Sequence, residues 1–80
     1  MLYTMAMTAN LNLKTQLYIG KKLREIRDEK SLSQEEVAQA TSISITYYAG
    51  IERGEENPTI TVIESLCKAL KIKSSSILPF

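Results

Sequence analysis

The chain has 80 residues, of which 44% are hydrophobic and 24% are charged, values typical of one small globular domain. Its formal net charge is only +1, so overall charge does not by itself indicate a polyanionic partner. The charge is unevenly placed, because residues 14–30 hold six basic and three acidic side chains, whereas the rest of the chain holds four basic and six acidic ones. The basic segment is either a solvated helix face or part of a contact with nucleic acid.

A single cysteine, Cys67, excludes an intramolecular disulfide and fits a reducing, cytoplasmic setting. No apolar run approaches the ~20 residues that a membrane-spanning helix needs, so we expect no membrane contact. The opening residues lack the basic and apolar regions of a signal peptide. We expect residues 1–13 to form an N-terminal arm or extension and residues 14–80 to form the domain.

The sequence argues against an enzyme. It contains no histidine, no set of cysteines for zinc, no phosphate-binding glycine loop and no Gly-x-Ser-x-Gly motif. The two pairs of carboxylates, Glu35–Glu36 and Glu55–Glu56, are adjacent in sequence and are not expected to converge on one substrate. We therefore predict no catalytic residue, no metal site and no cofactor.

Helical spacing of apolar residues predicts an all-α fold with five helices and no strand. Ser33 followed by Glu36 forms a capping-box pattern for the second helix, and Gly54 and Pro58 mark the end of the third and the loop after it. Either Thr59 or Thr61 is expected to cap the fourth helix. The expected helices cover residues 17–30, 34–41 and 45–53, a segment from about residue 60 to residue 70, and a short one starting at Ser74–Ser76.

The second and third helices have the features of a helix-turn-helix at residues 34–53. A small residue, Ala38, stands where two helices must cross closely. The apolar residues placed to fix the angle between them are Val37, Ile43, Tyr48 and Ile51. The outward face of the third helix is small or polar, as an approach to the edges of DNA bases requires. That face is expected to comprise Ser44, Ile45, Thr46, Tyr47 and Gly50.

The segment LSQEEVAQATSISITYYAGIERGEENPT resembles the phage repressor/Cro class of helix-turn-helix regulators. Within that class, the chain length and the run YxxGIERG look most like the controller proteins of restriction–modification systems. The resemblance covers about residues 19–80, and its most specific pieces are SQEEVA and GIERGEENPT. It implies a compact lambda-repressor-like domain that binds double-stranded DNA as a sequence-specific transcription regulator.

The resemblance also implies roles for individual residues. Gln34 matches a phosphate contact at the start of the second helix, and Asn57 matches a loop position whose backbone approaches phosphate. Arg27 and Glu52 match an ion pair that ties the first helix to the third, and we expect this pair to be structural. The positions matching DNA contacts on the third helix are Ser44, Thr46 and Tyr47.

Four residues depart from the family pattern. Ile45 stands where Arg or Gln usually pairs with a base, so it offers only apolar contact, either to a thymine methyl group or to a protein partner. Glu56 stands where related controller proteins often carry a basic residue. Ser42 replaces a turn glycine, so a left-handed turn there costs roughly 1 kcal/mol. Tyr48 replaces a smaller core residue.

The last residues, Ile77, Leu78 and Phe80, either close the core or form a dimer contact. We favour a homodimer on a palindromic operator, because one short recognition helix offers few base contacts and half-sites about 34 Å apart provide useful specificity. No segment remains for an effector domain, so no small-molecule effector is expected. The alternatives are a phage-type or antitoxin-type repressor, and an interaction module that has the fold without DNA binding.

Overall fold

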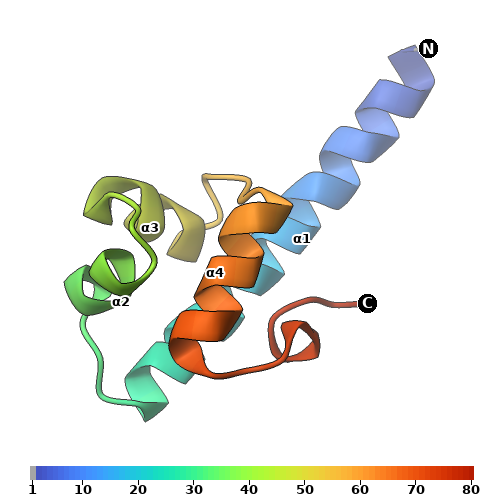
Figure 1. Ribbon diagram of the computed structural model, residues 1–80. Coiled ribbons are helices and arrows are strands. Elements are labelled where there is room, and N and C mark those ends of the chain that lie inside the picture. Colours follow the sequence, from blue (N-terminus) through green and yellow to red (C-terminus); the bar gives the residue numbers. More distant parts are fainter. Residues whose placement is uncertain (1) are drawn as a thin grey trace.

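A computed structural model describes residues 2–80, with side chains from residue 13 onward, and contains four α-helices and one 3₁₀ turn (Figure 1). The all-helical prediction is confirmed for this part of the chain, which holds no strand. The elements are α1 (Leu2–Glu29), α2 (Gln34–Ala40), α3 (Ile45–Glu52), α4 (Ile60–Leu70) and the 3₁₀ turn η1 (Ser74–Ser76).

Helix α1 is much longer than the segment 17–30 predicted from apolar spacing, since it starts at Leu2. Residues 2–13 contain neither Gly nor Pro and are rich in Leu, Met and Ala, so nothing in them ends the helix. A helix of 28 residues is about 42 Å long at 1.5 Å per residue. The longest extent of the molecule is also 42 Å, and the N-terminal turns of α1 project beyond the other helices (Figure 1).

The prediction of a fifth helix was wrong. The C-terminal segment instead contains a single 3₁₀ turn, Ser74–Ser76, and Ile77 follows this turn rather than lying within a helix. Three consecutive serines have low helix propensity and Pro79 cannot continue a helix, so one turn is all that this segment supports. Helix α4 ends just before it, with Lys71 in the left-handed conformation at φ 57°.

All four helices contribute to the core, and its most completely buried side chains include Tyr48, Leu23 and Leu66. Cys67 packs at the edge of this core, and burial raises the pKa of its thiol, as expected for a side chain that fills space. The buried hydrophobic residues are Ile19, Leu23, Val37, Ala38, Tyr48, Ile51, Ile63, Leu66, Leu70 and Ile77.

Helix α1 approaches the C-terminal end of α3 very closely. A Cβ atom added to Gly20 would lie 2.4 Å from the backbone oxygens of Ile51 and Glu52, so only glycine fits at this crossing. One turn earlier along α1, Leu17 packs on Gly54, which has φ +76° and ends α3. The longest helix of the molecule therefore fixes the end of α3.

Candidate nucleic-acid interface

Helix α2 begins with the capping box that the sequence predicted. The Ser33 hydroxyl accepts a hydrogen bond from the Glu36 backbone N–H at 3.0 Å, and the Glu36 carboxylate accepts one from the Ser33 backbone N–H at 2.8 Å. Two of the free N–H groups at the helix start are thereby satisfied. This reciprocal pair fixes where α2 begins.

The turn between α2 and α3 is tight. The Ile43 backbone N–H donates to the Ala38 carbonyl at 3.0 Å, and Ser42 adopts φ 58°, the left-handed conformation that was predicted to carry a cost at this position. The buried Thr41 hydroxyl donates to the Val37 carbonyl at 2.8 Å. Ala38 is buried at the helix crossing, so the small residue lies where the pattern placed it.

The first turn of α3 presents its side chains to solvent. Ser44 caps the helix, with its hydroxyl accepting a hydrogen bond from the Tyr47 N–H at 3.0 Å, and the same hydroxyl keeps a proton to donate. Ile45 is 46% exposed and Thr46 is exposed. Tyr47 is half-buried and packs partly against the core. Three of the expected DNA-binding residues are thus accessible and a fourth is accessible in part.

Gly50 does not belong to this exposed face, which corrects the prediction. It is buried, and a Cβ atom added to it would lie 2.6 Å from Cγ of Glu56. The loop after α3 folds back here, since the backbone N–H groups of Glu55 and Glu56 both donate to the Gly50 carbonyl, at 2.9 and 3.3 Å. Asn57 is exposed at the far end of this loop. The accessible part of α3 is therefore its N-terminal turn.

The side chain of Gln34 points into the domain rather than away from it. Its amide nitrogen donates to a carboxylate oxygen of Glu52 at 2.9 Å, and the residue is half-buried. An amide used in this way links α2 to α3, a role that the sequence did not indicate. Contact of Gln34 with phosphate stays a prediction.

Arg27 and Glu52 form the ion pair that the resemblance implied. Nε and Nη2 of Arg27 donate to the two carboxylate oxygens of Glu52 at 2.6 and 3.1 Å, and Nη1 donates to the Leu32 carbonyl at 2.9 Å. The side chains are 14% and 4% exposed. One guanidinium thus joins α1, the loop before α2, and α3.

Electrostatics within this cluster favour the ionised pair. Burial by itself would raise the pKa of Glu52, but the contacts with Arg27, Tyr48 and Gln34 outweigh burial and hold that pKa below its usual value. The Glu52 contact in turn raises the pKa of Arg27. Burial, with the carboxylate of Glu52 nearby, keeps the Tyr48 hydroxyl protonated by raising its pKa far above the usual range.

The Tyr48 hydroxyl lacks a hydrogen bond of regular geometry in this cluster. It is buried beside Glu52, yet no partner within the described residues meets it with good hydrogen-bond geometry. The sequence pattern predicted Tyr48 to be a core residue and did not indicate that its hydroxyl lies beside Glu52. The available signal was the spacing of Tyr48 and Glu52, which are four residues apart and so share one face of α3.

The surface around α3 is poor in free positive charge. Residues 34–57 contain one basic residue, Arg53, and five acidic ones. Arg53 is itself paired with Glu55, with a separation of 3.0 Å between the charged atoms. Binding of a polyanion here would depend on hydrogen bonds and apolar contacts, and on basic residues elsewhere.

The three C-terminal residues considered for a dimer contact differ in how far they are buried. Ile77 is fully buried in the core, which is the first of the two alternatives predicted for this segment and leaves no exposed surface for a dimer contact. Leu78 packs partly against the core, and Phe80 is 86% exposed. Leu78 and Phe80 line an open groove of about 400 Å³ together with Ile60, which is 80% exposed.

With α2, the turn and the exposed start of α3 in place, the geometry is that of a helix-turn-helix. The Helix-turn-helix family model matches residues 23–77, and the chain belongs to this family. No helix in the described residues is both long and apolar enough to cross a membrane.

Similar proteins include a control protein and a phage repressor. Control protein C.BamHI of Bacillus amyloliquefaciens is 39% identical over 75 residues, which cover 92% of this chain and 88% of that protein. The immunity repressor protein of Bacillus phage phi105 is 36% identical over 59 residues, or 74% of this chain, but this match spans only 41% of the repressor.

Among solved structures, the restriction-modification controller protein C.AhdI from Aeromonas hydrophila is similar along nearly its whole length. The TM-score is 0.76 at 35% sequence identity, and the match covers 79% of this chain and 96% of that one. The resemblance predicted from the sequence is confirmed by these comparisons.

Proposed function

We propose that this protein is a sequence-specific DNA-binding transcription regulator of the restriction–modification controller type. The observation that carries the proposal is the exposed N-terminal turn of α3, held by a buried frame, in a chain that matches C.BamHI over almost the full length of both proteins. In this arrangement α3 enters the major groove, where Ser44, Ile45 and Thr46 meet base edges.

Residues 14–80 would form the binding domain and residues 1–13 its extension, in keeping with a family match that starts at residue 23. Gln34, through its backbone, and Asn57, through the exposed loop, would contact phosphate. The protein would act on DNA in the cytoplasm without a small-molecule effector, so its concentration would set operator occupancy.

The proposal includes a homodimer on a palindromic operator. Phe80 and Ile60 are the most exposed large apolar side chains among those described, and they share one groove with Leu78. Exposed apolar groups gathered in this way are typical of a protein interface. Sedimentation of the wild type and of Phe80→Ser tests it: we expect a dimer that Phe80→Ser weakens, and a monomeric wild type at micromolar concentration contradicts it.

A binding assay on the DNA upstream of the protein's own gene tests the main proposal. We expect retardation that weakens steeply with salt, since phosphate contacts release counterions. Thr46→Ala should reduce binding, whereas Glu64→Ala, an exposed change on α4, should not. No retardation at low salt by a dimeric protein would contradict the proposal.

One observation favours a second function, an interaction module with the same fold. The single basic residue of the helix-turn-helix region, Arg53, is paired with Glu55, and residues 34–57 hold five acidic residues. A module of this kind would bind a protein through Ile45 and would show no salt-dependent retardation of DNA. A phage-type or antitoxin-type repressor, the other alternative, would differ in the genes it controls rather than in its chemistry.

A further inference from the structure

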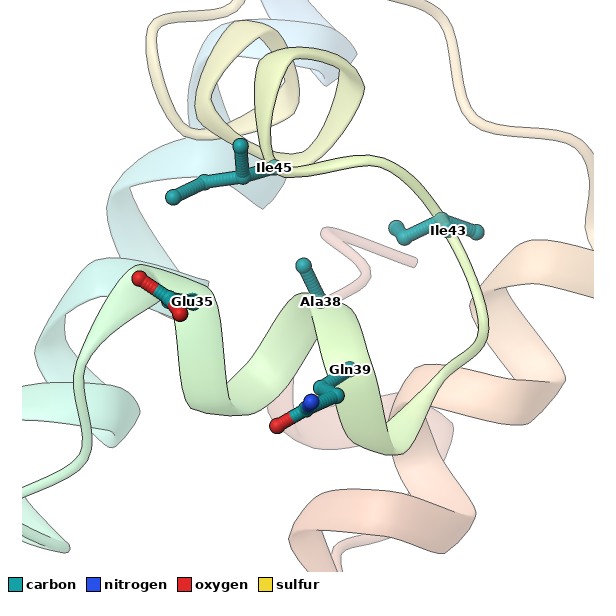
Figure 2. A pocket seen from close by; sticks show the side chains of 5 residues that line it. All are labelled: Glu35, Ala38, Gln39, Ile43 and Ile45. Carbon is teal, nitrogen blue, oxygen red and sulfur yellow. The ribbon is translucent and has the colours of Figure 1, made fainter.

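An open notch of about 430 Å³ lies between α2 and the start of α3, beside the proposed reading face. Figure 2 shows Ile45 at the start of α3, with Ala38 of α2 below it and Ile43 on the connecting turn. Glu35 and Gln39 lie on the α2 side. The notch is thus lined by three apolar residues and by two polar ones, Glu35 and Gln39.

Ile45 is the residue of this notch that most needs explanation. It is 46% exposed at the first position of α3, on the turn that the proposed function brings to the bases. A single exposed isoleucine is ordinary on a protein surface. One that continues an apolar notch at the tip of a recognition helix offers contact area with no hydrogen bonding of its own.

The base edges of the major groove carry one apolar group, the methyl group on C5 of a pyrimidine. The two polar residues of the notch suit such a base edge. The Glu35 carboxylate can accept a hydrogen bond from an exocyclic amine, as carboxylates do from cytosine N4, and its charge repels phosphate. The amide of Gln39 can pair with adenine. A base edge is therefore a better occupant than the DNA backbone.

We propose that this notch receives the C5-methyl group of a pyrimidine in the operator, and that Ile45 makes the protein specific for it. The inference rests on the proposed function and adds a ligand to one residue of the same site. Two bases supply the group. A thymine–adenine pair presents the methyl beside thymine O4, with the adenine amine on the other side of that oxygen, whereas 5-methylcytosine carries methyl and amine side by side on one base.

The experiment uses the intact protein and a duplex containing the footprinted operator. Each thymine of a half-site is replaced in turn by deoxyuridine, which removes only the methyl group, and each cytosine by 5-methylcytosine, which adds it. At one position of the half-site, we expect the duplex that carries the methyl group to bind about four times more tightly than the duplex that lacks it, which is the effect of one buried methyl group. The pair compared is either thymine with deoxyuridine or 5-methylcytosine with cytosine. The responding arm identifies the base.

The decisive variant is Ile45→Ala. Because Ile45 is exposed, we expect this variant to fold, and circular dichroism checks that it does. It should bind methylated and unmethylated duplexes equally. Thr46→Ala, the matched control on the same turn, should bind more weakly but keep the fourfold ratio. A wild type that binds the operator with no methyl-sensitive position overturns this inference alone, as does a ratio that survives in Ile45→Ala. Absence of all DNA binding overturns the proposed function as well.

Discussion

The two faces of α3 differ in burial and in the contacts that their side chains make with the rest of the domain. On the inner face, Tyr48 and Ile51 are fully buried and the Glu52 side chain is bound by Arg27 from α1 and Gln34 from α2. On the outer face, Ile45 and Thr46 meet solvent and contribute no hydrogen bond to the frame. The same eight-residue helix carries a heavily constrained side and an almost unconstrained one.

This contrast separates orientation from recognition. A helix of this length is not stable alone, so its direction must come from tertiary contacts. Those contacts are concentrated on the inner face and at the crossing with α1. Substitutions on the inner face should therefore change stability first, whereas substitutions on the outer face should change binding with little effect on folding.

The largest effect is expected for Arg27→Ala. It leaves the Glu52 carboxylate buried without its partner, which costs about 3–5 kcal/mol in comparable cases. For a chain of this size that is a large part of the free energy of unfolding. Thermal unfolding followed by circular dichroism measures it.

The matched control for Arg27→Ala is Arg53→Ala. Arg53 also pairs with a glutamate, Glu55, but both side chains are more than half exposed and water screens the pair. Its melting temperature should stay close to that of the wild type. If Arg27→Ala melts as the wild type does, the constrained inner face is not what holds α3.

Gly20→Ala is expected to come next. The new Cβ would collide with backbone oxygens of α3 that cannot move aside, and overpacking of this kind costs about 1–3 kcal/mol. Gly50→Ala is the comparison, because its Cβ would meet only the Glu56 side chain, which can rotate away. Equal losses of melting temperature in the two variants would contradict the close α1–α3 crossing.

The contrast also explains which features could be predicted from the sequence. The capping box at Ser33–Glu36, the buried Ala38 and the end of α3 at Gly54 follow from local chemistry, and all are observed. The start of α1 could not be placed, since residues 2–13 lack both a stop signal and a clear apolar stripe. Gly50 was predicted to be on the outward face, but the side chain of Glu56 covers it. Glu56 lies in a loop whose path cannot be predicted from local sequence patterns.

Acid should reduce the stability that the inner face of α3 contributes through Glu52. The folded state lowers the pKa of Glu52 below its ordinary value of 4.5, so the ionised carboxylate contributes stability above that value. This contribution is lost as pH falls through the lower, folded pKa. Melting temperatures between pH 7 and pH 3 should fall more steeply for the wild type than for Glu52→Gln. Parallel curves would show that Glu52 is not held ionised.

The smallest effect on stability is expected for Thr46→Ala on the outer face. Thr46 is exposed, and alanine has the higher helix propensity by about 0.5 kcal/mol, so the melting temperature should stay the same or rise slightly. Operator binding should weaken about fivefold if one hydrogen bond of ordinary strength is lost. Tyr47→Ala is a less clean probe, because Tyr47 packs partly against the core and its removal should also lower the melting temperature. A drop in melting temperature for Thr46→Ala would mean that the outer face helps to hold α3, whereas unchanged binding would move recognition away from this turn.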